Sequence, residues 1–222
     1  MTKANIVPYL LVIFDVDGTL IDSFGLFVDL LNTYADKYGY EVLEHERIEQ
    51  LRALSPRQIR QALNLSFFDT LRLMYDCKKS MQQHADTPQL FEGVEDLLKQ
   101  LKAQGVVLAV VTSNTRENCL CYFGAELFAC FDYMECNASI YGKVRQIKKI
   151  MQRSGCGAHQ ALYVGDQIID IQSAHKNKIR SAAVTWGFNH EAALRRHHPH
   201  MILHTVTELR QVLMDRSMSN SA

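Results

Sequence analysis

The chain has 222 residues, enough to bury a full core in one large domain or in a domain that carries a smaller insertion. Its 24 basic and 24 acidic side chains cancel, and binding to a phosphate backbone normally needs a basic surface excess, so no nucleic-acid partner is expected. The apolar run at residues 6–14 is too short to span a membrane and ends at Asp15 without a cleavage site of small residues, which excludes a membrane partner and a secretory signal.

Six cysteines occur at positions 77, 119, 121, 130, 136 and 156, without a C-x-x-C pair or a regular spacing. Cys119 and Cys121 are two apart in a predicted helix and do not face each other, so no metal site is expected there. This number and spacing of cysteines favours reduced thiols with a role in packing only, and it predicts a cytoplasmic protein.

The first predicted element is a strand at residues 9–14, apolar enough to be buried on both faces. Asp15 and Asp17 follow it directly, and side chains at i and i+2 of a strand share one face. The two carboxylates would repel each other, and one pKa would rise, unless a divalent cation or a lysine lies between them. These residues favour a metal-assisted reaction at the strand end. The alternative is an acidic exit from the strand into a turn made by Gly18.

Residues 23–84 show helical periodicity without the alternation that is typical of strands, which predicts an all-helical insert. The first helix is expected at residues 24–38, capped by Asp22 or Ser23 and stopped by Gly39. Further helices are expected at residues 46–54, 56–64 and 67–83.

From Gly93 onward helices and strands alternate. The predicted helices are residues 94–104, 116–123, 143–153, 170–177 and 208–215, and the predicted strands are residues 106–111, 161–164, 181–185 and 201–203. This alternation is typical of a doubly wound parallel α/β sheet. Residues 216–222 are predicted to be a disordered tail.

Polar residues directly follow three of the apolar strands. Asp15 follows the first, Thr112-Ser113-Asn114 follows the strand at 106–111, and Asp166 follows the strand at 161–164. In open parallel sheets the ligand crevice lies at the carboxyl ends of the strands, so these side chains are expected to converge. Two more charged residues are candidates for the same site: Lys143 at a helix start, and Asp170 one helical turn after Asp166.

This set of motifs resembles the haloacid dehalogenase superfamily. The matching features are D-x-D-G-T at residues 15–19, Thr112-Ser113, Lys143, and G-D-x-x-x-D at residues 165–170. The sequence around Tyr141-Gly142-Lys143 and Tyr163-Val164-Gly165-Asp166 is similar to that of the phosphoglycolate phosphatase-like branch, and the helical insert resembles a C1-type cap. The resemblance implies a Rossmann-like core at residues 1–21 and 89–215 and a cap at residues 22–88.

The resemblance also implies a role in phosphoryl transfer for each motif residue. Asp15 would be the nucleophile that forms an aspartyl-phosphate, and Asp17 would protonate the leaving alcohol and then activate water. Mg²⁺ would be bound by Asp15, the backbone carbonyl of Asp17, and Asp166. In the remaining roles, Thr112 and Ser113 bind phosphoryl oxygens, Lys143 neutralises charge, and Asp170 holds Lys143 or a metal-bound water.

The implied activity is Mg²⁺-dependent hydrolysis of a small phosphorylated metabolite. Asp17 favours phosphate chemistry, because the dehalogenases of the superfamily lack this second carboxylate and use no metal. Phosphomutases keep the whole residue set, so a phosphomutase is an alternative. A regulatory protein that kept the phosphate site and lost turnover is another. The identity of the ester and the oligomeric state do not follow from the sequence.

Arg52 lies in the turn at residues 51–57, where cap loops of the resembled family reach over the substrate. It is the first candidate for binding an anionic leaving group, because a guanidinium pairs bidentately with carboxylate or phosphate. The alternative is a solvated turn between two helices. The cap is expected to close over the site, with hinges near residues 20–23 and 87–92.

Overall fold

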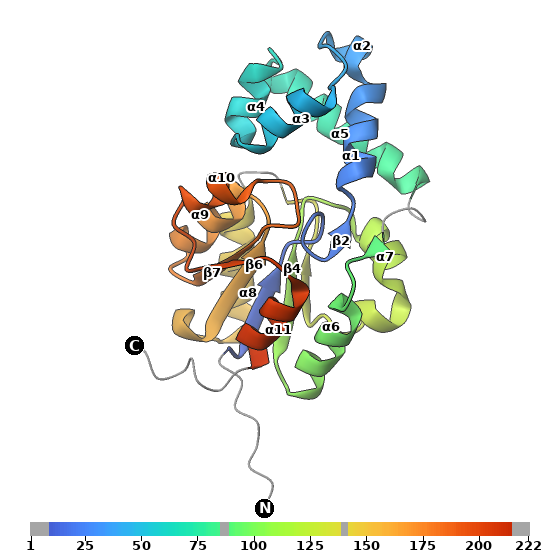
Figure 1. The fold of residues 1–222 in the computed structure, drawn as a ribbon. Helices are drawn as coiled ribbons and strands as arrows, with labels where there is room; N and C mark the ends of the chain where they lie inside the picture. Colours follow the sequence, from blue (N-terminus) through green and yellow to red (C-terminus); the bar gives the residue numbers. More distant parts are fainter. Residues whose placement is uncertain (1–8, 85–88, 139–141, 215–222) are drawn as a thin grey trace, which may run out of the picture.

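The structure of the protein is a computed structural model, and it describes residues 9–84, 89–138 and 142–214. Within these residues the core is a six-stranded parallel sheet in the order β5-β4-β1-β6-β7-β8 (Figure 1). The strands are β1 (Leu11–Phe14), β4 (Val107–Val111), β5 (Tyr133–Glu135), β6 (Ala161–Gly165), β7 (Arg180–Val184) and β8 (Met201–Leu203). The prediction of a doubly wound α/β core is confirmed, although β5 was not predicted.

Strand β1 runs through the centre of the sheet. Leu11 pairs with Val107 of β4 on one side and with Ala161 of β6 on the other. The four residues of β1 are at most 1% exposed, which explains why they are all large and apolar. Because neighbouring parallel strands end at the same edge, the residues that follow β1, β4 and β6 meet there.

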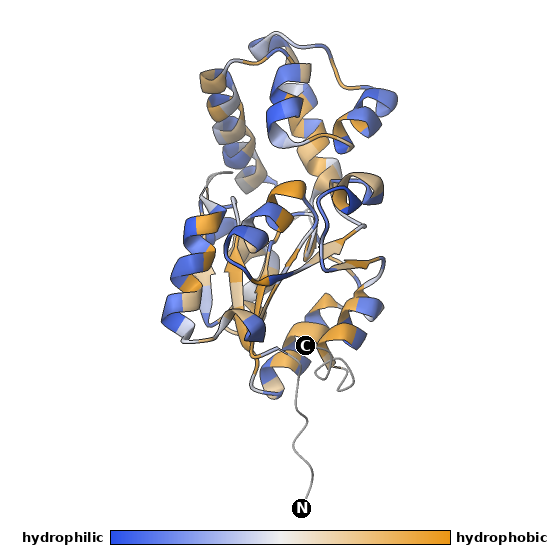
Figure 2. Ribbon diagram, turned by 90° about the vertical axis from the view of Figure 1, so that its left-hand side faces the viewer, coloured by the Kyte–Doolittle hydropathy of each residue, from blue (hydrophilic) through white to orange (hydrophobic). Residues whose placement is uncertain are grey.

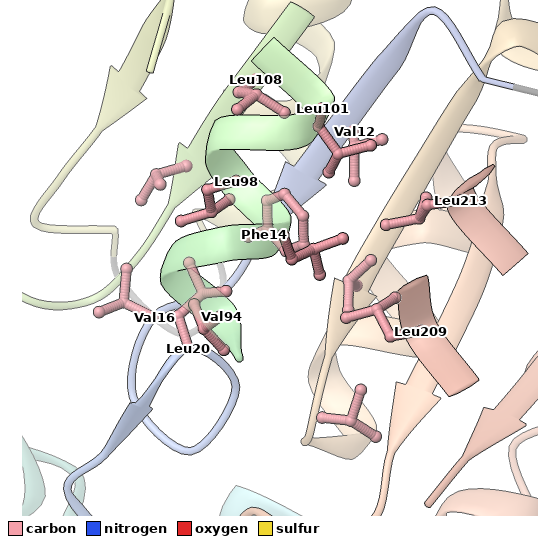
Figure 3. Packing of buried hydrophobic residues seen from close by; sticks show 14 of the residues in the cluster. Val12, Phe14, Val16, Leu20, Val94, Leu98, Leu101, Leu108, Leu209 and Leu213 are labelled. Atoms are coloured by element: carbon pink, nitrogen blue, oxygen red, sulfur yellow. The ribbon is translucent and has the colours of Figure 1, made fainter. Parts of the chain in front are cut away.

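Helices cover both faces of the sheet (Figure 1). One face packs against α6 (Val94–Ala103), α7 (Arg116–Phe128) and α11 (Val206–Met214), and the other against α8 (Lys143–Ser154), α9 (Ile168–Lys176) and α10 (Glu191–Arg195). Figure 3 shows Val94, Leu98 and Leu101 of α6 in the same apolar cluster as Phe14 of β1. The strands are apolar, whereas the outward faces of the helices are hydrophilic (Figure 2).

Helix α7 and a short 3₁₀ turn of the core differ from the predictions. Helix α7 was predicted to end at Phe123, but the chain kinks at Gly124, which has φ 65° and ψ 167°, and then continues to Phe128. Glycine adopts this left-handed φ without a Cβ clash, so the kink does not end the helical segment. A 3₁₀ turn, Ala158–Gln160, leads into β6 and was not predicted.

A group of helices lies above the carboxyl edge of the sheet (Figure 1). Its members are α1 (Phe24–Thr33), α2 (Ala35–Tyr38), α3 (His45–Arg52), α4 (Pro56–Ala62) and α5 (Phe67–Gln83). They share an apolar cluster of their own, separate from the two clusters that flank the sheet. The single helix predicted at residues 24–38 is divided in two at Tyr34, whose N–H still donates to Leu30 and Leu31.

Short strands connect these helices to the core. Strand β2 (Ile21–Asp22) pairs antiparallel with β3 (Gln89–Leu90), and both lie at the connections predicted as hinges. Neither strand was predicted, because two residues are too few to show a period. Residues 87 and 88 of the second connection and the predicted tail at 216–222 lie outside the described residues. In the part that the structure describes, no helix has the length and apolarity to cross a membrane.

Candidate active site

The predicted convergence of side chains at the carboxyl ends of the strands is present in the structure. Asp15 follows β1, Asp166 follows β6, and Lys143 is the first residue of α8. The Lys143 Nζ lies 2.6 Å from Asp15 Oδ2 and 2.6 Å from Asp170 Oδ1. All four of these charged side chains are buried, so residues 128 positions apart in the chain form one ion-paired group.

Burial and charge act against each other in this group. Burial lowers the pKa of Lys143, but the Asp15 and Asp170 carboxylates outweigh burial and hold that pKa above its ordinary value. Burial raises the pKa of Asp15 well above its ordinary value, the Lys143 ammonium opposes that shift, and the nearby Asp170 and Asp166 carboxylates add to it. Lys143 is therefore the cation that opposes protonation of this buried carboxylate.

The acidic side chains lie close enough together to bind one metal ion. Ligand oxygens of Asp15, Asp166 and Asp170 lie within 4.8 Å of one another. Burial, with the Asp170 charge next, raises the pKa of Asp166 to about 7. In the described chain no donor is bound to the backbone carbonyl oxygen of Asp17. Carboxylate and carbonyl oxygens are the ligands that Mg²⁺ prefers, so this donor set fits the predicted ion.

The loops around Asp166 hold its carboxylate in place. The Thr19 hydroxyl donates to Oδ1 at 2.8 Å, and the Phe188 N–H donates to Oδ2 at 2.7 Å. A Cβ at Gly18, which has φ +75°, would come within 2.4 Å of Asp166 Oδ2, and a Cβ at Gly187 would come equally close. Glycine is thus required at both places, because any side chain would displace the carboxylate.

Asp17 is held by two neutral donors. The Ser23 hydroxyl donates to Oδ1 at 2.9 Å, and the Asn114 amide donates to Oδ2 at 3.1 Å. Burial raises the pKa of Asp17, and these hydrogen bonds oppose that shift. A raised pKa suits a group that must hold a proton and then release it. The Asp17 side chain is not part of the acidic cluster, so only its carbonyl is available to a metal in the predicted way.

Asn114 is a functional candidate that the sequence did not single out. Its side-chain oxygen accepts from Thr115 N–H at 2.9 Å and from the Asn118 amide at 2.7 Å, which orients its NH₂ toward Asp17. All three polar residues after β4 were suitable candidates for the site. Beyond the end of a strand, side chains no longer alternate between the two faces of the sheet, so the sequence does not show which of them point into the site. The direction of the Asn114 side chain could therefore be known only from the structure.

The two residues predicted to bind phosphate take different positions. Thr112 is fully buried, and its hydroxyl accepts from the Asn114 N–H at 3.0 Å. Ser113 is half-buried and lines a cavity that also contains Asp17 and Asp166. The structure therefore brings Ser113 to the open side of the site, while Thr112 shapes the loop beneath it.

The cavity at the site has a volume of about 210 Å³ and lies between the core and the helices above it. Lys78 of α5 reaches it and was not predicted as a site residue. Burial lowers the pKa of Lys78, and the charge of Asp17 opposes that shift. Among the described residues Lys78 has no hydrogen bond and no ion pair, so its ammonium is free to bind an anion.

A sequence signal for Lys78 existed. The face of α5 that lines the cavity carries residues 70, 73, 74, 77, 78 and 81, which follow helical spacing and are apolar except at 70 and 78. A lysine on the inner face of an amphipathic helix requires a partner or solvent.

Arg52 lies at the edge of the site and does not line the cavity. Its Nε donates to the Phe188 carbonyl at 2.8 Å, its Nη2 donates to the Gly187 carbonyl at 3.0 Å, and its Nη1 pairs with Glu49. The alternative that Arg52 lies in a solvated turn is wrong, because its side chain is only 19% exposed. Binding of a leaving group by Arg52 stays a prediction, and it would require these contacts to break.

Replacing Arg52 by glutamine is expected to loosen the loop at residues 186–190. The variant loses two charge-assisted hydrogen bonds from the helices to the core, each worth about 1.5–3 kcal/mol. Amide hydrogen exchange in the loop should become at least about 10-fold faster, because one such bond corresponds to that factor. The control is Arg57→Gln, since Arg57 is exposed on α4. Equal exchange rates in both variants would contradict the prediction.

Comparison with known proteins identifies the family of the chain. Residues 12–184 match the haloacid dehalogenase-like hydrolase family. The chain is 32% identical to phosphoglycolate phosphatase of Synechococcus elongatus, over 91% of this chain and 96% of that protein. It is 26% identical to pyrophosphatase PpaX of Bacillus pumilus, over 89% of this chain and 93% of that protein.

A solved structure shares the fold. A haloacid dehalogenase-like family hydrolase from Streptococcus pneumoniae superposes with a TM-score of 0.74 at 24% identity, over 91% of this chain and 97% of that one. The chain belongs to the haloacid dehalogenase-like hydrolase family, in its phosphoglycolate phosphatase-like branch. Its enzymatic class is therefore that of a phosphoric monoester hydrolase.

Proposed function

We propose that the protein is a Mg²⁺-dependent phosphatase that hydrolyses a small phosphate monoester through an aspartyl-phosphate on Asp15. The observation that supports this most directly is the buried Lys143 ammonium, 2.6 Å from Asp15 and beside the acidic cluster. A cation and a set of oxygen ligands beside the nucleophile suit the charge that spreads over phosphoryl oxygens during transfer.

The reaction takes place in two displacements. In the first, an Asp15 carboxylate oxygen attacks phosphorus, the ester P–O bond breaks, and Asp17 gives its proton to the leaving oxygen. In the second, Asp17 takes a proton from water, the water oxygen attacks phosphorus, and the bond to Asp15 breaks. The products are the alcohol and inorganic phosphate. Ser23 and Asn114 hold the Asp17 carboxyl in place for both proton transfers.

Asp15, Asp166 and the Asp17 carbonyl would hold Mg²⁺, which supplies positive charge to the phosphoryl oxygens. Asp170 accepts from Lys143, from the Tyr163 hydroxyl at 3.1 Å and from the Gln167 N–H at 3.0 Å. These bonds suit a residue that positions Lys143. Thr112 would donate a hydrogen bond to a phosphoryl oxygen, alongside backbone N–H groups near Val16 and Ser113.

The domain limits stay part of the proposal. The cap is residues 22–88 and the core is residues 1–21 and 89–215, joined at the β2–β3 ribbon. Closure of the cap would exclude water from the phosphoryl group. The protein would act in the cytoplasm, a place that its six unpaired cysteines favour.

Phosphoglycolate is one candidate ester, because the relative from Synechococcus elongatus is a phosphoglycolate phosphatase. Other relatives are a pyrophosphatase and a 5'-nucleotidase of Pseudomonas aeruginosa, so the leaving group varies among proteins of this kind. The residues that choose it are expected in the cap.

Purified protein is expected to release phosphate from 4-nitrophenyl phosphate with Mg²⁺ and to stop in EDTA. Mg²⁺ should also raise the Tm, by an amount that corresponds to about 2.7 kcal/mol when its concentration is 100-fold above Kd. Asp166→Asn should weaken both effects, because it removes a charged ligand. Sodium chloride at equal ionic strength is the control. Phosphoryl transfer to a second sugar phosphate without phosphate release would instead identify a phosphomutase, and no turnover on any ester would identify a binding protein.

Lys78→Met is expected to lower kcat/KM by roughly 10–100-fold, mainly through KM. The substitution keeps the length of the side chain and removes the unpartnered ammonium at the cavity, and a hydrogen bond to a charged group is worth about 1.5–3 kcal/mol. Steady-state kinetics on 4-nitrophenyl phosphate measure the effect. Lys79→Met is the matched control, because Lys79 is the exposed neighbour on α5. Equal values of kcat and KM for both variants would mean that Lys78 does not bind the substrate.

A further inference from the structure

The cavity continues from the catalytic end into the interior of the cap. Its lining there is apolar and comes from four helices, with Phe27, Val28 and Leu31 of α1, Leu51 of α3, Ile59 of α4 and Leu73 of α5 among its residues. A water molecule needs only about 10–15 Å³ of such space, so a cavity of about 210 Å³ exceeds any ordinary packing defect.

Three of the four charged side chains of the lining lie at one end of the cavity. Lys78, Asp17 and Asp166 lie there. Farther inside, the Thr70 hydroxyl donates to Ser66 O at 2.9 Å, and Arg60, the one charged side chain there, has a long contact of 3.4 Å to Leu65 O. The cavity thus has a charged mouth and an interior that is apolar apart from Thr70 and Arg60.

From this arrangement we propose that the substrate is a phosphate monoester with an apolar leaving group, an alkyl or aryl body that enters the cap while the phosphate stays at Asp15. The inference rests on the proposed phosphatase activity and gives its substrate class. A highly polar leaving group would lose its hydration inside the cap without gaining partners, and such unpaired burial is unfavourable. An apolar body leaves water for a surface that is already apolar.

The test is a series of n-alkyl phosphates from methyl to hexyl, assayed by phosphate release with Mg²⁺. Burial of each methylene should raise kcat/KM by about 4-fold until the cavity is filled. A flat or falling series, with the short esters still hydrolysed, overturns the inference and leaves the phosphatase proposal intact.

Variants that fill the cavity separate its role from general hydrophobic effects. Val28→Trp should remove most of the gain with chain length, because Val28 lines the cavity. Ile59→Trp, on a different helix, gives the same test if the first variant does not fold. Leu71→Trp is the matched control, since Leu71 is 51% exposed on α5 and outside the lining. A chain-length gain that survives both cavity variants overturns the inference.

Binding measurements keep the test independent of turnover. Methyl, butyl and hexyl phosphonates cannot be hydrolysed, and calorimetry with Mg²⁺ present gives their affinities for the full chain. If no ester is hydrolysed, the phosphatase proposal fails, and an affinity that rises with chain length and is lost in Val28→Trp still supports an apolar ligand in the cap. Phosphonate affinities that do not change with chain length, or no binding, overturn it.

Discussion

Asp15→Asn is expected to abolish phosphate release, with a loss on the order of 10⁴-fold or more. The amide has nearly the shape of the carboxylate, so the substituted side chain can occupy the same place beside Lys143, but it has no anionic oxygen to attack phosphorus. The effect should exceed that of Asp17→Asn, because loss of a general acid typically costs about 10²–10⁴-fold. Phosphate release from 4-nitrophenyl phosphate under single-turnover and steady-state conditions measures both losses.

The aspartyl-phosphate gives this prediction a second readout. Wild-type protein mixed with labelled ester and quenched in acid should carry label on one aspartate, and Asp15→Asn should carry none. Asp36→Asn is the control, because Asp36 is exposed on α2 and does not line the cavity. Label on the Asp15→Asn protein, or activity within 100-fold of wild type, would place the nucleophile elsewhere.

The positions of Asp15, Asp166 and Lys143 were predictable because each depends on a regular element. β1 and β6 are continuous apolar runs, and such runs form inner strands of a parallel sheet whose carboxyl ends meet. Lys143 begins a helix that returns from the same edge. The spacing in the chain is large, but the topology brings these ends together.

The contacts of helices α1 to α5 were less predictable because they depend on how this helical group docks on the core. Arg52 was considered as a substrate ligand, yet its nitrogens bond to the carbonyls of Gly187 and Phe188, which lie more than 130 residues later. The Asn189 amide likewise donates to the Arg52 carbonyl at 2.7 Å. Periodicity gives the face of each cap helix but not the partner that the face meets.

Lys143→Met is expected to lower the free energy of unfolding by about 3–5 kcal/mol in EDTA, in addition to abolishing turnover. The substitution leaves the Asp15 and Asp170 carboxylates buried without the cation that now lies 2.6 Å from each. Because the pKa of Lys143 is raised in the folded state, its contribution is present at every pH below the ordinary lysine pKa and is lost only as pH rises through the higher folded value. Urea unfolding should therefore show a loss at every pH from 7 to 9.

The matched control is Lys149→Met on the same helix. Lys149 is 55% exposed and pairs with Glu135, and an exposed pair of this kind contributes at most about 1 kcal/mol. A loss of similar size in both variants would mean that the buried ammonium adds no more than a surface charge. The prediction of a strongly stabilising buried ion pair would then be wrong.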